Sequence, residues 1–189
     1  MNYSYRGERF RLGLGGTFTP GVKYLILINI GIFILQKIFG STMTAYFGLV
    51  PESLLHKFAI WQLFTYMFLH GGILHIFINM LVLWMFGSDL EREWGTREFL
   101  KYYFICGIGA GLIQVIFNAW IFPGNRFIPV VGASGAIYGL LLAFALLFPN
   151  REIYLLLFFF LPVRIQAKYL AMIFAGIALF SGVFGADNG

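Results

Sequence analysis

Charged residues are scarce in this sequence of 189 residues, since Asp, Glu, Lys and Arg together make up 11%, against about 25% in ordinary soluble domains. Hydrophobic residues make up 60% of the chain and aromatic residues 20%. A single core in a chain of this length cannot bury so much apolar surface, so a large part of it faces lipid. The composition therefore excludes a water-soluble globular protein and predicts an integral membrane protein.

Cysteine is almost absent as well. Cys106 is the single cysteine, and it lies in an apolar run, which excludes an internal disulfide framework and a cysteine-based metal cluster. No H-E-x-x-H pattern and no carboxylate accompany His75, so we predict no metal ion and no cofactor. The net charge of +5 would suggest nucleic acid in a soluble chain, but here its distribution indicates topology, and we predict no nucleic-acid partner.

Charge-free intervals predict the membrane spans, because a charged side chain at the centre of the bilayer costs at least about 2.5 kcal/mol. Four intervals are long enough to cross a bilayer about 30 Å thick. They lie between Lys57 and Asp89, Lys101 and Arg126, Arg126 and Arg151, and Lys168 and Asp187. Residues 24–36 form a fifth, shorter span, because Lys37 can extend its long side chain to the interface. The predicted fold class is an all-α polytopic membrane helix bundle.

Two further segments are predicted to lie at the membrane surface. The apolar run 153–163 is too short to cross as a helix, so we expect an interfacial or re-entrant piece. In the long first loop, residues 51–58 begin with Pro51 and have the pattern of a short amphipathic helix. We expect this helix in the outer interface.

The Lys and Arg residues predict the orientation. Ten of the thirteen lie at the amino end and in the second and fourth loops, which predicts a cytoplasmic amino terminus. Residues 1–21 lack the apolar core of a signal peptide and are expected to form a flexible cytoplasmic tail, followed by one membrane domain over residues 22–189. From the short tail and compact loops we expect a bacterial cytoplasmic membrane.

Three polar residues interrupt the second span: His70, His75 and Asn79. His75 and Asn79 are four residues apart and share one helix face, whereas His70 points elsewhere or precedes the helix. Such residues often serve only as hydrogen-bonding partners between helices. The residues alone leave open whether they pack helices together or form a site.

The second polar feature lies around Ser134, between Gly132 and Gly135, at the outer end of the fourth span. Gly135 and Gly139 are four apart, which allows a neighbouring helix to approach closely, so Ser134 could be one more small packing residue. Alternatively, a serine at a helix amino terminus, preceded by a flexible glycine, has backbone N–H groups nearby that stabilise an oxyanion. Both polar features lie towards the outer halves of their helices and so can meet in space.

These motifs together resemble the rhomboid intramembrane serine proteases, over residues from about 61 to 185. The resemblance rests on Trp61-Gln62, His70-x4-His75-x3-Asn79, Glu91-Arg92-x-Trp94-Gly95 and Gly132-Ala133-Ser134-Gly135-x2-Tyr138. It implies a Ser134 nucleophile, with His75 and Asn79 joining the Ser134 backbone in an oxyanion hole. It also implies supporting roles for Gly132, Gly135, Tyr138 and His70, with Tyr138 beside the catalytic base. Glu91 and Arg92 would brace the second loop.

The resemblance also implies a sixth span that carries the catalytic histidine of a Ser–His dyad. No histidine follows His75 in this sequence, and we expect Asp187-Asn188-Gly189 to begin the loop to that span. The membrane domain is thus expected to be incomplete at its carboxyl end, with Gly135, Gly139 and Ala143 on the face that the sixth helix would cover. Family members often carry Arg where Gln62 stands, so the sequence leaves open how the first loop is braced.

The predicted function is that of an intramembrane serine endopeptidase that cleaves single-span membrane proteins near the outer membrane face. Its partners are transmembrane protein substrates and the lipid bilayer. The alternative is a catalytically inactive rhomboid-like protein that binds transmembrane helices, which the absence of a dyad histidine from this sequence favours. Retention of Ser134 and Asn79 favours the enzyme, because a binding protein has no need of an oxyanion hole.

Overall fold

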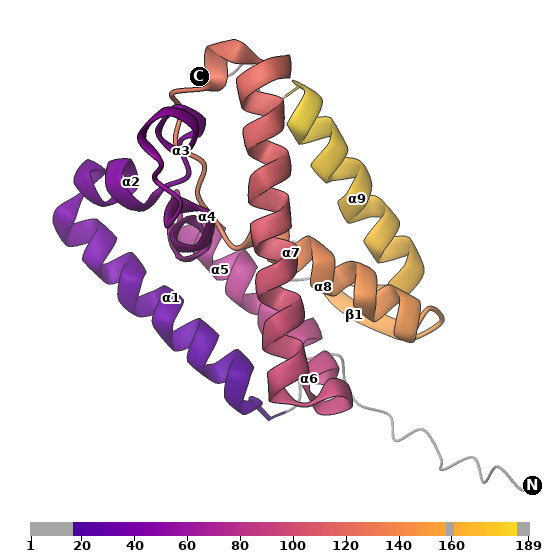
Figure 1. Ribbon diagram of the computed structural model, residues 1–189. Coiled ribbons are helices and arrows are strands. Elements are labelled where there is room, and N and C mark those ends of the chain that lie inside the picture. The colour runs from indigo at the N-terminus through magenta and orange to yellow at the C-terminus, as the bar shows by residue number, and fades with distance from the viewer. Residues whose placement is uncertain (1–16, 158–160, 185–189) are drawn as a thin grey trace, which may run out of the picture.

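The computed structural model describes residues 17–157 and 161–184. In this part the chain forms a helix bundle with one small β-hairpin (Figure 1), which confirms the predicted fold class. Most of the expected tail and the expected loop segment Asp187-Asn188-Gly189 lie outside the described residues.

The elements follow one another with short connections. In chain order they are α1 (Pro20–Phe39), α2 (Ser41–Phe47), α3 (Pro51–Lys57), α4 (Gln62–Thr65), the 3₁₀ turn η1 (Tyr66–Phe68), α5 (Ile73–Val82), the π turn η2 (Leu83–Gly87), α6 (Ser88–Trp94), α7 (Thr96–Ile116), the π turn η3 (Phe117–Ile121), the 3₁₀ turn η4 (Pro123–Asn125), α8 (Ser134–Leu147), β1 (Glu152–Leu157), β2 (Leu161–Gln166) and α9 (Ala167–Phe184). Helix α3 confirms the short helix predicted to begin at Pro51.

Three helices in the described part are long and apolar enough to cross a membrane: Pro20–Phe39, Ile73–Trp94 and Thr96–Ile121. The other two predicted spans correspond to α8, a shorter apolar helix, and to α9, which has 18 residues and begins with the apolar segment Ala167–Ile177. With 14 residues, α8 is about 21 Å long. It begins beside the middle of α7 (Figure 1), so Ser134 lies well inside the length of the bundle.

Helix α1 begins at Pro20, just inside the segment expected as tail. Proline suits the first helical position because its fixed φ is already helical and its missing N–H has no partner there anyway. The helix ends at Gly40, whose φ of +59° is accessible to glycine at little cost.

The small residues of α8 pack against α7. A Cβ atom on Gly135 would lie 2.5 Å from the Cβ of Ala110, and one on Gly139 would lie 2.5 Å from the Sγ of Cys106. The expectation that these glycines face a missing sixth helix is therefore wrong. Their spacing predicts that some helix approaches closely, but it does not say which one, and the third span occupies the position.

The run 153–163 does not cross as a helix, as predicted, but its form is a hairpin. Strands β1 and β2 pair antiparallel, with Glu152 opposite Gln166 and Leu157 opposite Leu161. Ile, Tyr, Leu and Val suit strands, and a proline is tolerated on the edge of a two-stranded ribbon. Ile153 is buried, so the base of the hairpin joins the core near the carboxyl end of α8.

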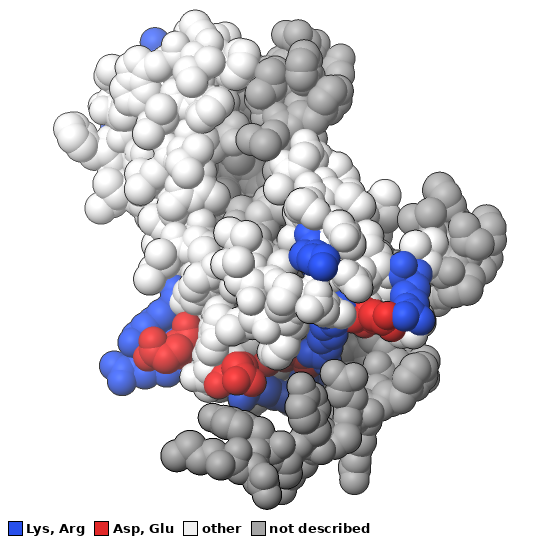
Figure 2. All heavy atoms as spheres, turned by 90° about the vertical axis from the view of Figure 1, so that its right-hand side faces the viewer, with Lys and Arg blue, Asp and Glu red and all other residues white. Residues whose placement is uncertain are grey.

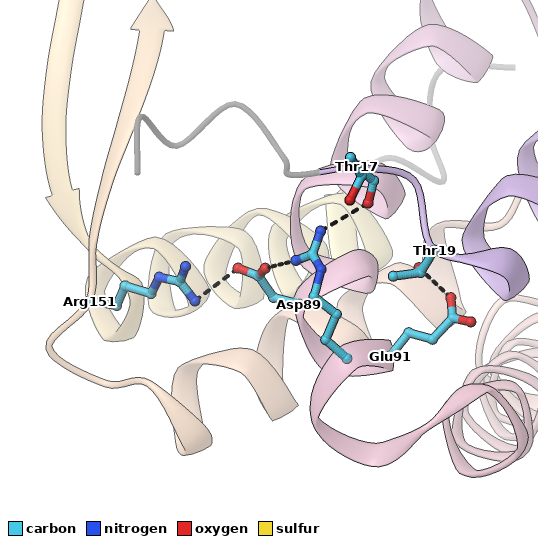
Figure 3. Close-up of polar contacts among 6 residues, drawn as sticks. Thr17, Thr19, Asp89, Glu91 and Arg151 are labelled. Carbon is cyan, nitrogen blue, oxygen red and sulfur yellow. Dashed lines mark hydrogen bonds and ion pairs between the residues drawn. The ribbon is translucent and has the colours of Figure 1, made fainter. Parts of the chain in front are cut away.

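Charged side chains gather in a band at one end of the molecule (Figure 2). This region, here called the charged end, contains Asp89, Glu91, Arg92 and Arg151, and the uncharged residues Thr17 and Thr19 hydrogen-bond to it. Asp89 pairs with Arg92 of its own helix and, at 2.8 Å, with Arg151 of the turn before β1 (Figure 3). Arg92 also donates to the carbonyl of Thr17 at 3.0 Å. Asp89 and Arg92 together thus connect α6 with the turn before β1 and with the segment before α1.

Glu91 is buried beside this network and caps α1. Its carboxylate accepts the backbone N–H groups of Gly21 and Val22 at 2.7 and 2.9 Å and the hydroxyl of Thr19 (Figure 3). It also accepts the hydroxyl of Thr96 at 2.6 Å, across the second loop. A carboxylate at a helix amino terminus satisfies free N–H groups and opposes the helix dipole. Glu91 therefore braces the second loop, as expected, and fixes α1 as well.

Candidate active site

The second predicted span is interrupted before its polar residues. Turn η1 ends at Phe68 and α5 begins at Ile73, so Gly71 and Gly72 lie in the break between them. His70 therefore precedes the helix, one of the two placements predicted for it. His75 and Asn79 follow on one face of α5, one turn apart.

Ser134 is the first residue of α8, and Gly132 before it takes a conformation that favours glycine. The φ of Gly132 is +128°, and its N–H donates to the carbonyl of Tyr66 at 2.9 Å. A Cβ atom on Gly132 would lie 2.9 Å from both Nε2 and Cε1 of His75 and 3.7 Å from the Ser134 Oγ. The two polar features of the sequence therefore meet, as predicted, and the imidazole lies directly against the turn that leads to Ser134.

The orientation of the His75 ring is fixed by its other nitrogen. Nδ1 lies 3.3 Å from the backbone N–H of Gly71 and accepts its hydrogen bond. A neutral imidazole has one donor and one acceptor nitrogen, so the proton resides on Nε2, the atom that faces Gly132. His75 is thus oriented to donate a hydrogen bond beside Ser134.

Asn79 and His70 each carry buried side-chain nitrogen atoms that have no hydrogen-bond partner among the described residues. Asn79 is 6% exposed, and its Nδ2 has no hydrogen-bond partner among the residues that the structure describes. His70 is 1% exposed, and its ring packs edge-on against His75 with centroids 5.1 Å apart. Asn79 therefore has a free donor one turn from His75, whereas His70 lies behind the His75 ring.

Tyr138 and Gly135 lie on the first turns of α8. The ring of Tyr138 is half-buried, with its centroid 6.4 Å from that of Phe174 on α9. Gly135 faces α7, as described above. Within residues 17–157 and 161–184, the hydrogen bond of the His75 imidazole is with the Gly71 N–H and not with the Ser134 hydroxyl. No group of three or more His, Cys, Asp or Glu side chains in this part of the chain could hold a metal ion.

Gln62 braces the first loop, a role that the sequence left open. Its Oε1 accepts the N–H of Val50 at 3.1 Å, and its Nε2 donates to the carbonyl of Tyr46 at 3.2 Å. Leu49 pairs with Val130 in an isolated antiparallel bridge. The braced loop is therefore joined to the strand-like segment that leads into Gly132, and a glutamine suffices for the bracing.

Gln36 is a residue that sequence reasoning missed. Its amide, on α1, makes two hydrogen bonds of 3.0 Å to the backbone of His70. The only signal available was a polar residue near the end of an apolar helix, and nothing in the sequence indicated its partner 34 positions away.

Comparison with known proteins gives the family. A family model for the Rhomboid domain matches residues 57–188. The chain is 36% identical over 143 residues to the rhomboid protease GluP of Bacillus subtilis, covering 72% of this chain and 26% of that protein. It is 42% identical over 86 residues to RHOMBOID-like protein 1 of Arabidopsis thaliana, covering 46% and 20% respectively.

A third relative is the rhomboid protease GlpG of Serratia proteamaculans, 27% identical over 126 residues, with 67% of this chain and 41% of that protein covered. The chain thus spans less than half the length of each of these relatives. The matched region nevertheless includes the helix break, α5, the charged end and the turn before Ser134, and the chain belongs to the rhomboid family.

Proposed function

We propose that this protein is an intramembrane serine endopeptidase with Ser134 as its nucleophile. The observation that carries the proposal is the close approach of the His75 imidazole to Gly132, two residues before Ser134, which begins α8. A nucleophile, a helix amino terminus and an oriented imidazole N–H are three of the parts that acyl transfer uses, and a general base is the fourth.

In the proposed reaction, Ser134 Oγ attacks a backbone carbonyl of a transmembrane substrate. The oxyanion accepts hydrogen bonds from the Ser134 N–H, His75 Nε2 and Asn79 Nδ2. A general base takes the Ser134 Oγ proton during the attack and gives it to the amine as the C–N bond breaks. Water then hydrolyses the acyl-enzyme ester, which releases a carboxylic acid and restores the Ser134 hydroxyl. Because His75 Nε2 carries its proton as a donor, it is a poor base for Ser134; the family resemblance assigns that role to a histidine of a further span. The scheme needs no metal or cofactor.

The proposed orientation places the amino terminus in the cytoplasm and the reaction near the outer face. It is supported by the distribution of Lys and Arg and by the separation of the charged end from the loops around α2, α3 and α4 (Figure 1). Transmembrane proteins are the proposed substrates and the bilayer the other partner. A bacterial cytoplasmic membrane remains our prediction, while relatives come from bacteria and a plant alike.

The test uses the intact protein in lipid vesicles with a model single-span substrate. We expect Ser134→Ala to abolish cleavage and to abolish covalent labelling by a fluorophosphonate probe, while the helical content stays unchanged. Ser88→Ala is the matched control, because Ser88 is a buried serine at the charged end. Cleavage that persists in Ser134→Ala would refute the assignment.

The second candidate is an inactive rhomboid-like protein that binds transmembrane helices. It is favoured by the orientation of His75: Nδ1 accepts the Gly71 N–H, so the ring edge that faces Gly132 carries the proton and is a poor base for Ser134. This candidate predicts that the intact protein binds the model substrate with no cleavage and no fluorophosphonate labelling of Ser134. Labelling of Ser134 would exclude it.

A further inference from the structure

The break between η1 and α5 poses a hydrogen-bonding problem. Residues 69–72 are not helical, so their backbone groups lack the partners that a helix supplies. Such irregular backbone is tolerated at membrane depth only where other groups of the protein satisfy it. His70, in the middle of the break, is 1% exposed, so the protein itself must supply these partners.

Gln36 of α1 supplies them for His70. The Gln36 Oε1 accepts the His70 N–H at 3.0 Å, and the Gln36 Nε2 donates to the His70 carbonyl at 3.0 Å. The same Nε2 lies 3.4 Å from the Oγ1 of Thr44. The side-chain amide thus pairs with one residue much as a neighbouring strand would, and only a side chain with one donor and one acceptor at this reach can do so.

The peptide unit between His70 and Gly71 orients the imidazole of His75, the proposed oxyanion donor. The N–H of Gly71 belongs to the same peptide unit as the His70 carbonyl, so a bond that fixes this carbonyl also fixes the direction of the N–H. That N–H donates to Nδ1 of His75 at 3.3 Å. The opposite edge of the ring, with Nε2, faces Gly132 beside Ser134.

We propose that Gln36 is a positioning residue of the active site: by holding the His70 peptide, it directs the Gly71 N–H at His75 and keeps that imidazole in its Nε2–H tautomer. This inference rests on the proposed function for its catalytic meaning, but not for its geometry. Gln36 lies outside the matched region 57–188, so the first helix contributes to the site as well as to the bundle.

A merely structural role for Gln36 predicts something different. If the amide only tied α1 to the break, its loss would lower stability and leave the His75 tautomer unchanged. The tautomer is therefore the decisive observable. Nitrogen-15 chemical shifts of labelled histidine distinguish Nδ1–H from Nε2–H directly, without any requirement for catalysis.

The experiment compares the intact protein, Gln36→Met and Gln36→Asn in lipid bilayers by NMR with labelled histidine. Methionine keeps the length but removes both hydrogen bonds, and asparagine keeps the amide but withdraws it by one methylene. The matched control is Gln114→Met, since Gln114 is also half-buried in a span and its amide donates to Asn118 at 3.1 Å, away from the break.

In the wild type and in Gln114→Met, we expect the signals of His75 to show the Nε2–H tautomer alone. In each Gln36 variant that folds, we expect His75 to show a mixture of the two tautomers. Cleavage by these variants should fall about 10- to 100-fold in kcat with little change in KM, as for a misplaced group. An unchanged His75 tautomer in the folded Gln36 variants would overturn the proposal. That result is separate from failure of the proposed function, which would appear as cleavage by Ser134→Ala whatever the tautomer.

Discussion

Two regions of the molecule, the charged end and the surroundings of Ser134, hold their polar groups by different means. At the charged end, Asp89 and Glu91 bind cations, hydroxyls and backbone N–H groups through several bonds each. Around Ser134 the polar contacts are single and neutral, as in the Gly71 N–H to His75 bond. Asn79 Nδ2 lacks a partner within the described part of the chain.

This difference indicates that the charged end stabilises the fold and that the surroundings of Ser134 carry the reaction. A carboxylate with four donors is satisfied in the folded state and has no capacity left for a ligand. A buried amide donor without a partner costs free energy, and such a cost is common at sites that bind a developing charge. Substitutions at the charged end should therefore change stability, and substitutions near Ser134 should change the rate.

The largest effect is expected from Gly132→Ala. The new Cβ would meet the His75 ring at 2.9 Å and would require a φ of +128°, so the ring and the turn before Ser134 must both shift. We expect cleavage to fall by more than about 1000-fold, measured as kcat/KM in vesicles. Gly124→Ala is the control, because a Cβ atom there would meet nothing within 4 Å. An equal loss of kcat/KM in both variants would contradict a special role for the turn before Ser134.

Asn79→Ala should give the next largest effect. Removing one oxyanion donor typically costs roughly 100- to 1000-fold in rate, and we expect this loss in kcat with stability nearly unchanged. Asn118→Ala is matched to it, since Asn118 is equally buried at 6% exposure in another span. An unchanged rate for Asn79→Ala would assign Asn79 to helix packing instead.

Glu91→Gln tests the charged end. The Glu91 carboxylate accepts hydrogen bonds from two backbone N–H groups and two hydroxyls. The substitution removes its negative charge and places an NH₂ group, itself a donor, against these donors. We expect a loss of about 2 kcal/mol in the free energy of unfolding, with kcat of the folded protein unchanged. The control is Glu93→Gln, exposed on the same helix. A large fall in kcat without loss of stability would contradict the division between the ends.

The smallest effect is expected from Arg151→Met. Arg151 pairs with Asp89 at 2.8 Å while 38% of its side chain is exposed, and such pairs contribute less than about 1 kcal/mol. Methionine keeps the apolar contact with the rings of Phe144 and Phe148, over which the guanidinium lies. The control is Arg164→Met, which removes an exposed ion pair on the hairpin and should change the free energy of unfolding even less. A loss of several kcal/mol in the free energy of unfolding of Arg151→Met would show that the ion pairs of the charged end act as one unit.

Much of this fold follows from the sequence, because charge-free length is a strong signal in a membrane protein. The placement of His75 and Asn79 on one helix face also follows from the sequence, because they are four residues apart. The position of Ser134 at the start of a helix follows from the glycine that precedes it by two residues. The glycines of α8 show the limit of such reasoning, since spacing reports a close contact but not the partner. The hairpin at Glu152 and the Gln36–His70 pairing depend on tertiary contacts that no local pattern encodes.

The most direct test of the site is the structure of the intact protein after phosphonylation by a fluorophosphonate, which leaves a phosphoryl oxygen where the oxyanion would form. The arrangement described here predicts the adduct on Ser134, with that oxygen within hydrogen-bond distance of His75 Nε2, Asn79 Nδ2 and the Ser134 N–H. An adduct on another residue, or an oxygen directed away from both side chains, would contradict it.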